Sequence, residues 1–313
     1  MGQDPLKYFM RQNLFLSFMD TLLVTGASGF LGWNICLAAR QQWNVVGLCH
    51  SSEIARGVTR VIGDSIDFAG MDRIFREIQP DAVIHAAALS DPNYCELHPS
   101  ESLRVNVEAS EHIAQLCSRN GARCAFISTD LVFDGEQPPY SEKSLVNPVG
   151  VYGRHKAEAE KRMSQAFAGL LVCRMPLMFG DAPPAAKSFI HPMIDSLMGG
   201  KDLALFVDEF RTPVAAADAA RGILSLVGMV TGTVHLGGKV RISRYDFGRV
   251  LGECLGLSDP KIAAVFRKDL VMPAPRPADV SLDSSKAFSL GYDPDKPRVA
   301  LMKCACVKNR GNQ

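Results

Sequence analysis

The segment TGASGFLG, which contains Gly26, Gly29 and Gly32, constrains the fold of this chain more than any other stretch. It separates a β-rich run at residues 21–26 from a helical pattern at residues 30–42, and a second β-rich run, NVVGLC, follows. A strand, a tight glycine turn, a helix and a strand within about thirty residues form a βαβ unit. Because its crossover connection requires parallel strands, the sequence predicts a parallel sheet that starts at this turn.

The alternation of strand and helix patterns continues to about residue 175. The run Ala82–Ala88 is largely apolar instead of alternating, as expected for a strand covered on both faces. We therefore predict an α/β fold: a doubly wound parallel-sheet Rossmann domain with a smaller, discontinuous α/β substrate-binding domain. The expected parts are an N-terminal extension (1–19), the NAD(P)-binding Rossmann domain (20–175 plus about 214–240), the substrate-binding domain (about 176–213 plus 241–295) and a C-terminal tail (296–313).

The charge and composition exclude several classes of partner. The net charge is +1, from 34 basic and 33 acidic residues that are interspersed, which predicts neither a nucleic-acid nor a membrane partner. The apolar run Leu14–Met19 is too short for a signal peptide or a membrane span, so we read the first residues as an extension or a start-site artefact, with Met19 as the alternative start. The nine scattered cysteines are typical of reduced thiols, and Cys304 and Cys306 lack further zinc ligands. We expect a cytoplasmic protein without a metal site.

The glycine turn also predicts a dinucleotide site. Small residues let a diphosphate approach the backbone, and the helix N-terminus offers it unpaired N–H groups. After the second strand, where an acidic side chain would bind the ribose of NAD, stand His50 and Ser51, although Glu53 lies close enough to keep NAD open. Asp64 and Ser65 end the third strand, where they either meet the adenine or form a helix cap. NADP(H) is thus favoured over NAD(H). The expected cofactor contacts are Gly26, Ser28, Gly29, Phe30, Leu31, Gly32, His50, Ser51, Asp64 and Ser65.

Tyr152 and Lys156 stand four residues apart at the start of a helical pattern, so they share one helix face. This spacing alone occurs in many chains. Here, however, the preceding strand ends in Ser128 and Thr129, at the edge where open α/β sheets bind ligands. A carbonyl reductase needs a proton donor, and tyrosine, with an ordinary pKa of about 10, needs a neighbouring ammonium group and a cationic nicotinamide to become more acidic. Ser128 or Thr129 would then hydrogen-bond the substrate oxygen.

At this point the chain resembles the extended short-chain dehydrogenases/reductases, and among them the dTDP-4-dehydrorhamnose reductase group. The resemblance covers about residues 21–292. Its separate pieces, in chain order, are TGASGFLG, PDAVIHAAA, RVNVEAS, STDLVFDG, YGRHKAEAE, CRMPLMFG, DEFRTPVAAADAARGI and RPADVSLDSSK. STDLVFDG, RTP and the late RP…SLD…K narrow the match to the reductase group.

The resemblance implies a role for each matching residue. Tyr152 would donate the proton, and Lys156 would hold the nicotinamide ribose and lower the pKa of Tyr152. Thr129 would bind the substrate carbonyl oxygen with Ser128 close by, and Asn106 would support the active-site helix and its proton relay. The further residues implied are Ala86, Ala87 and Ala88 along the cofactor, and Asp130, Arg211 and Arg276 along the nucleotide sugar. Surface charge is the alternative role for the two arginines.

Two segments depart from the reductase pattern where the sugar ring should lie. Leu177 and Met178 stand where an aromatic residue is usual, and Pro92, Asn93 and Tyr94 stand where a threonine-rich loop is common. These departures leave the predicted fold, cofactor and hydride chemistry intact. They leave open which sugar is bound.

The predicted function is therefore NAD(P)H-dependent reduction of a 4-keto nucleotide sugar, and the predicted partner is that substrate. An epimerase stays open, whereas a dehydratase is disfavoured because Thr129 is followed by Asp130 and Leu131 instead of Asp-Glu. A non-catalytic NADP-binding regulatory subunit also stays open, because the β subunit of methionine adenosyltransferase resembles the same group. A homodimer is compatible with the sequence.

Overall fold

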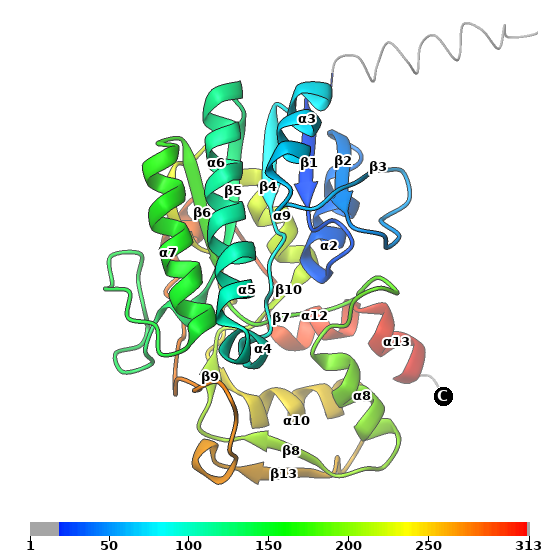
Figure 1. Ribbon diagram of the computed structural model, residues 1–313. Helices are drawn as coiled ribbons and strands as arrows, with labels where there is room; N and C mark the ends of the chain where they lie inside the picture. Colours follow the sequence, from blue (N-terminus) through cyan, green and yellow to red (C-terminus); the bar gives the residue numbers. More distant parts are fainter. Residues whose placement is uncertain (1–18, 312–313) are drawn as a thin grey trace, which may run out of the picture.

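The computed structural model describes residues 19–311, so the predicted extension lies outside the described residues except for Met19. Its larger layer is a seven-stranded sheet with the order β11-β6-β5-β4-β1-β2-β3, in which every neighbouring pair is parallel (Figure 1). The predicted doubly wound α/β fold is confirmed. The strands are β1 (Thr21–Thr25), β2 (Asn44–Cys49), β3 (Thr59–Ile62), β4 (Ala82–His85), β5 (Arg123–Thr129), β6 (Leu170–Met175) and β11 (Gly232–His235).

Helices cover both faces of this sheet and bury its side chains in two separate clusters (Figure 1). Leu22 and Val24 of β1 belong to the first cluster, with α2 and α9, whereas Leu23 belongs to the second, with α3, α6 and α7. Because both faces are dry, the central strands need apolar residues at every position. The covering helices are α2 (Phe30–Ala39), α3 (Phe68–Ile78), α6 (Ala109–Asn120), α7 (Val151–Ala166) and α9 (Ala216–Leu226).

Residues 99–120 do not form one continuous helix, because a π-helical turn, η1 (Arg104–Glu108), follows the short helix α5 (Pro99–Leu103) and precedes α6. A π turn inserts a residue into the helix and redirects the side chains near it, and such turns are common at functional sites. Here the turn contains two fully buried side chains, Asn106 and Val107. The short elements elsewhere are α4 (Pro92–Leu97), η2 (Asp130–Val132), η3 (Arg267–Asp269) and α11 (Ser285–Ser289).

A smaller layer lies below the carboxyl ends of the strands in Figure 1 and has its own apolar core. It contains α8 (Ile190–Met198), α10 (Arg244–Cys254) and the parallel pair β8 (Leu203–Phe206) and β13 (Ile262–Val265). Two small ladders connect the layers: β7 (Met178–Phe179) with β10 (Val214–Ala215), and β9 (Phe210–Arg211) with β12 (Ile242–Ser243).

The segment that the sequence analysis set apart as a tail is helical in its described part. α12 (Pro297–Lys303) and α13 (Ala305–Gly311) place Ala300, Leu301 and Val307 in the core of the smaller layer. On α12, Ala300 and Leu301 lie three and four positions after Pro297, so the three buried residues form one face of the helix, which is the reason that it packs. Within residues 19–311, no helix is both long and apolar enough to cross a membrane.

We predict that Gly153→Ala destabilises the protein by about 2 kcal/mol, the scale expected for overpacking. Gly153 lies on α7, and a Cβ there would approach the Leu131 carbonyl oxygen to 2.1 Å, so the helix would have to move. Gly150→Ala is the matched control, because its nearest non-adjacent atom would be 3.5 Å away. Urea unfolding measures both free energies, and equal stabilities for the two variants would contradict the prediction.

Candidate functional site

A cleft of about 840 Å³ runs along the carboxyl edge of the sheet, between the two layers. Its lining takes one or more residues from the ends of six of the seven strands, including Gly26 after β1, His50 after β2, Ala86 after β4, Thr129 at the end of β5 and Met175 at the end of β6. In a parallel sheet the strand ends of one direction meet at one edge, which explains why segments far apart in the sequence converge here.

The glycine turn forms one end of the cleft and admits only glycine at two positions. Gly26 has a φ of +67°, and a Cβ there would lie 2.8 Å from the backbone of Ala87. A Cβ on Gly32 would lie 2.1 Å from the Gly26 carbonyl oxygen, so α2 packs directly on the turn. Its N-cap, Gly29, offers no capping side chain, which leaves first-turn N–H groups free for an anion. This cradle fits the diphosphate of a dinucleotide.

The residues predicted to surround the adenosine divide into two groups. His50, Asp64 and Ser65 line the cleft, and His50 Nε2 lies 3.7 Å from Asp64 Oδ1. Ser51 and Glu53 are exposed and lie outside the lining. The Ser51 carbonyl oxygen instead accepts a hydrogen bond from Arg60. Among the described residues of this end, His50 is therefore better placed than Glu53 to meet a ribose.

Tyr152 and Lys156 lie on α7 and face the middle of the cleft, next to Thr129. Burial, followed by the nearby Cys95 and Asp130, raises the pKa of Tyr152 above its usual value, and a hydrogen bond with Thr129 opposes the shift. Burial lowers the pKa of Lys156 to about 7, and the charge of Glu160 opposes it. Tyr152 is thus protonated at neutral pH. The expectation that Lys156 and a bound nicotinamide lower the pKa of Tyr152 stays a prediction for the cofactor-bound protein.

Asn106 lies behind the cleft and is not part of its lining. Its side-chain amide donates to the Leu89 carbonyl and accepts from the Leu89 N–H, both at 3.0 Å, which holds the segment that follows Ala86–Ala88. It also donates to Ser102 Oγ at 3.1 Å, and Ser102 Oγ lies 2.8 Å from Nδ1 of His155 on α7. Asn106 therefore connects the loop after β4 with the helix that carries Tyr152.

Ser128 lines the cleft, but its hydroxyl donates to Glu160 Oε1 at 2.5 Å. Glu160 in turn accepts hydrogen bonds from Arg174, the shortest at 2.7 Å from Nη2. The Thr129 hydroxyl, in contrast, bonds within the cleft, to Asp130 Oδ1 at 3.2 Å. Of the two neighbouring hydroxyls, that of Thr129 is the better placed for a substrate oxygen.

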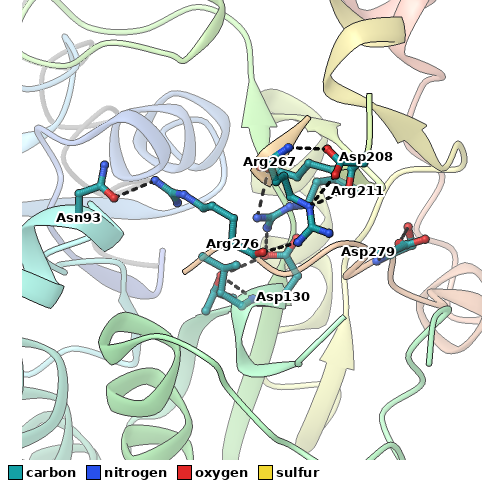
Figure 2. A network of polar contacts seen from close by, with 11 residues as sticks. Asn93, Asp130, Asp208, Arg211, Arg267, Arg276 and Asp279 are labelled. Carbon is teal, nitrogen blue, oxygen red and sulfur yellow. Dashed lines mark hydrogen bonds and ion pairs between the residues drawn. The ribbon is translucent and has the colours of Figure 1, made fainter. Parts of the chain in front are cut away.

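A buried ion pair marks the other end of the cleft. Arg211 Nη1 donates to Asp130 Oδ1 at 2.7 Å (Figure 2). The Nη2 atom of Arg211 lies 3.6 Å from Glu209 Oε1. The three residues expose 7% or less of their surface. Within residues 19–311, Asp130 Oδ2 and Arg211 Nε have no hydrogen-bond partner, so each can still form one hydrogen bond.

Arg276 reaches across the cleft from the segment that precedes Asp279. Its Nη2 donates to Asn93 Oδ1 on α4 at 3.3 Å, and its carbonyl oxygen accepts a hydrogen bond from Arg267 Nη1 at 2.6 Å (Figure 2). This contact connects the two layers at a position where the sequence departs from the reductase pattern, Asn93.

The sequence analysis missed three charged residues of the lining, Glu101, Glu209 and Arg244. Glu209 lies in the segment DEFRTP, two residues before Arg211, so this segment already contained its signal. Arg244 starts α10 and lies over the ring of Phe189 at 4.5 Å, a position that only the tertiary structure reveals. Burial lowers the pKa of Arg244 to about 10. The negative charge of Glu209 raises this pKa, whereas the positive charges of Arg211 and Arg276 lower it further.

A glycine-cradled cleft on a parallel sheet, with a threonine at a strand end facing a helical Tyr-x-x-x-Lys pair, defines a protein of the extended short-chain dehydrogenase/reductase class. The family model described as RmlD substrate binding domain matches residues 19–306. The chain therefore belongs to this family, and its predicted resemblance to the dTDP-4-dehydrorhamnose reductase group is confirmed.

Individual relatives carry different names. Methionine adenosyltransferase 2 subunit beta of Bos taurus is 28% identical over 88% of this chain and 84% of its own length. The Haloferax volcanii protein named "Probable low-salt glycan biosynthesis reductase Agl14" is 31% identical over 84% of this chain and 89% of its own. The crystal structure of a hypothetical dTDP-4-dehydrorhamnose reductase from Sulfolobus tokodaii is 32% identical, with a TM-score of 0.77 over 87% of this chain and 94% of that one.

We predict that Arg211→Met lowers the free energy of unfolding by about 3–5 kcal/mol, because it leaves Asp130 as a buried carboxylate without its cation. The double variant Asp130→Asn/Arg211→Met should recover most of this loss. Arg298→Met, which breaks an exposed pair with Glu253, is the control and should cost less than about 1 kcal/mol. Urea unfolding at pH 7 compares them. A loss for Arg211→Met no larger than that of the control would show that the buried pair is not coupled as described.

Proposed function

We propose that this protein is an NADP(H)-dependent reductase of a 4-keto nucleotide sugar. The observation that carries the proposal is that one cleft brings together the glycine cradle and the Tyr152, Lys156 and Thr129 side chains. The identity with the Haloferax reductase and the Sulfolobus structure supports the same class of reaction.

Each side chain has one task in the proposed reaction. Thr129 hydrogen-bonds the substrate carbonyl oxygen, and Tyr152 transfers its phenolic proton to that oxygen. A bound nicotinamide would supply the hydride for the carbonyl carbon. Lys156 holds the ribose next to it and, as a cation, stabilises the tyrosinate that proton transfer leaves behind. The apolar lining from Met175 and Leu177 limits access of water to these groups.

The charged end of the cleft binds the nucleotide diphosphate in this proposal. Arg211, Arg244 and Arg276 line it together with two carboxylates, Asp130 and Glu209. Asp130 pairs with Arg211, whereas Arg276 contacts the neutral Asn93 and Arg244 contacts an aromatic ring. The latter two guanidinium groups are the ones best able to accept phosphate oxygens.

A regulatory role is the second candidate, and the relatives named methionine adenosyltransferase 2 subunit beta favour it. The catalytic residues do not separate the two candidates, because a regulatory subunit can keep a cofactor site. The experiment is an NADPH-oxidation assay against a panel of 4-keto nucleotide sugars, with NADH in parallel. Turnover of one sugar supports the reductase. A stoichiometric partner in pull-downs, with no turnover of any sugar, supports the regulatory subunit.

We predict that Tyr152→Phe lowers kcat by a factor of about 100 to 10,000, because it removes the proton donor and keeps the ring. NADPH affinity, measured by fluorescence, should change less than about twofold, since the hydroxyl is not needed to hold the cofactor. Tyr245→Phe, a substitution outside the cleft lining, is the control. A Tyr152→Phe enzyme with most of its turnover would refute the assigned acid.

We also predict that NADPH binds more tightly than NADH and that His50→Asp reverses this order. A carboxylate at this position repels a ribose 2′-phosphate and hydrogen-bonds a ribose hydroxyl. The ratio of the two dissociation constants should change by about tenfold or more, which is about 1.4 kcal/mol. Glu53→Gln, at an exposed position outside the lining, should leave the ratio unchanged. If Glu53→Gln weakens NADH binding instead, Glu53 and not His50 selects the cofactor.

A further inference from the structure

A second buried ion pair lies directly behind the cleft, between Glu160 on α7 and Arg174 on β6. Arg174 donates to Glu160 through Nε at 3.0 Å and through Nη2 at 2.7 Å, and the two side chains are 6% and 10% exposed. Ser128 on β5 donates to the same carboxylate at 2.5 Å. Three elements thus hold one carboxylate in a single position.

This carboxylate belongs to the turn of α7 that follows Lys156. Residues four apart on a helix are neighbours on one face, with roughly 5–6 Å between their Cβ atoms. The Lys156 side chain is 2% exposed, and its Nζ lies 3.9 Å from the centre of the Phe126 ring. An ammonium group enclosed in this way loses its hydration and becomes neutral more easily, unless an anion lies close to it.

The other titratable groups near Lys156 supply no such anion. His85 on β4 is fully buried, and burial together with Lys156 lowers its pKa to about 3, so its ring is neutral. Cys95 on α4 has its pKa raised, chiefly by burial, so its thiol is neutral as well. Tyr152, one turn earlier on α7, is a protonated phenol. Of these neighbours on α4, β4 and α7, only Glu160 carries negative charge toward the ammonium group.

Arg174 pairs with the carboxylate from β6 and offsets part of its charge, but Arg174 is not among the groups that lower the pKa of Lys156, whereas Glu160 raises it. The remaining nitrogen of Arg174, Nη1, lies 3.4 Å from His235 Nε2 on β11, farther along the sheet. The guanidinium group therefore fixes the Glu160 carboxylate from β6, one helical turn from Lys156.

We propose that Glu160 is a positioning residue that keeps Lys156 in its charged form, with Arg174 and Ser128 holding the Glu160 carboxylate in place. The inference rests on the proposed function in one respect, that Lys156 contacts the cofactor. It assigns a task to a buried pair that lies outside the cleft lining.

The direction of the effect follows from the lysine equilibrium. Lys156 is charged below its pKa, which is about 7 in the cofactor-free protein, and Glu160 raises this pKa against the effect of burial. If the charged form binds the cofactor, affinity falls as the pH rises past this value. Removing the Glu160 charge lowers the pKa, so the fall in affinity should begin at lower pH.

The test is the pH dependence of NADPH affinity, measured by fluorescence between pH 5.5 and pH 9. In Glu160→Gln the decline should begin about one pH unit lower than in the wild-type protein, the scale expected for loss of one nearby opposite charge. Because that variant leaves Arg174 unpaired, the double variant Glu160→Gln/Arg174→Met provides the same measurement without an isolated buried charge. Glu158→Gln, on the same helix but paired with the half-exposed Arg162, is the matched control and should follow the wild-type profile.

The outcomes separate this inference from the proposed reductase activity. Profiles of both Glu160 variants that coincide with that of the wild-type protein would overturn the positioning role, whatever the enzyme reduces. A shifted profile in a protein that turns over no keto sugar would support the positioning role and refute the reductase. A wild-type protein without NADPH affinity would overturn both.

Discussion

Both faces of the seven-stranded sheet are buried, and this constraint determines where polar chemistry can take place. Side chains in the middle of the central strands have to be apolar, because helices cover them on either side. Polar side chains can be accommodated at low energetic cost only where the strands end. Because the strands are parallel, their carboxyl ends meet at one edge of the sheet. The glycine turn, Thr129 and the start of α7 converge on the cleft as a result of this arrangement.

The groups that do enter the interior are paired across elements. Glu160 and Arg174 join α7 to β6, and Asp130 and Arg211 join the strand end of β5 to the smaller layer. A buried charge without a partner is costly, so each of these pairs fixes the relative position of the elements that it connects. The first pair lies behind Lys156 and the second beside Thr129. The electrostatics of the cleft are therefore set by residues from both layers.

Much of the fold could be predicted from the sequence, because βαβ units have local signals. The glycine turn, the apolar strands and the helix that carries Tyr152 were visible as spacing and composition. The site was predictable where the chain matches a known motif, as at Thr129 and Lys156. Arg244 and the task of Ser128 were not predictable in this way. Arg244 is positioned because it begins α10 in the smaller layer and packs on Phe189. The task of Ser128 depends on its hydrogen bond to Glu160, which lies 32 positions away in the chain.

The packing of the last helices has a consequence for the order in which the molecule matures. Chains are synthesised from the N-terminus, and their domains tend to fold as units once complete. Six strands of the sheet lie before residue 176, whereas the core of the smaller layer includes Ala300, Leu301 and Val307 near the end of the chain. The segment that forms the glycine cradle is thus present before synthesis of the chain is complete. The strands that carry the glycine turn and Thr129 are therefore synthesised before α9, β11 and Tyr292, which complete the first core cluster, and before Leu301 and Val307, which complete the core of the opposite wall.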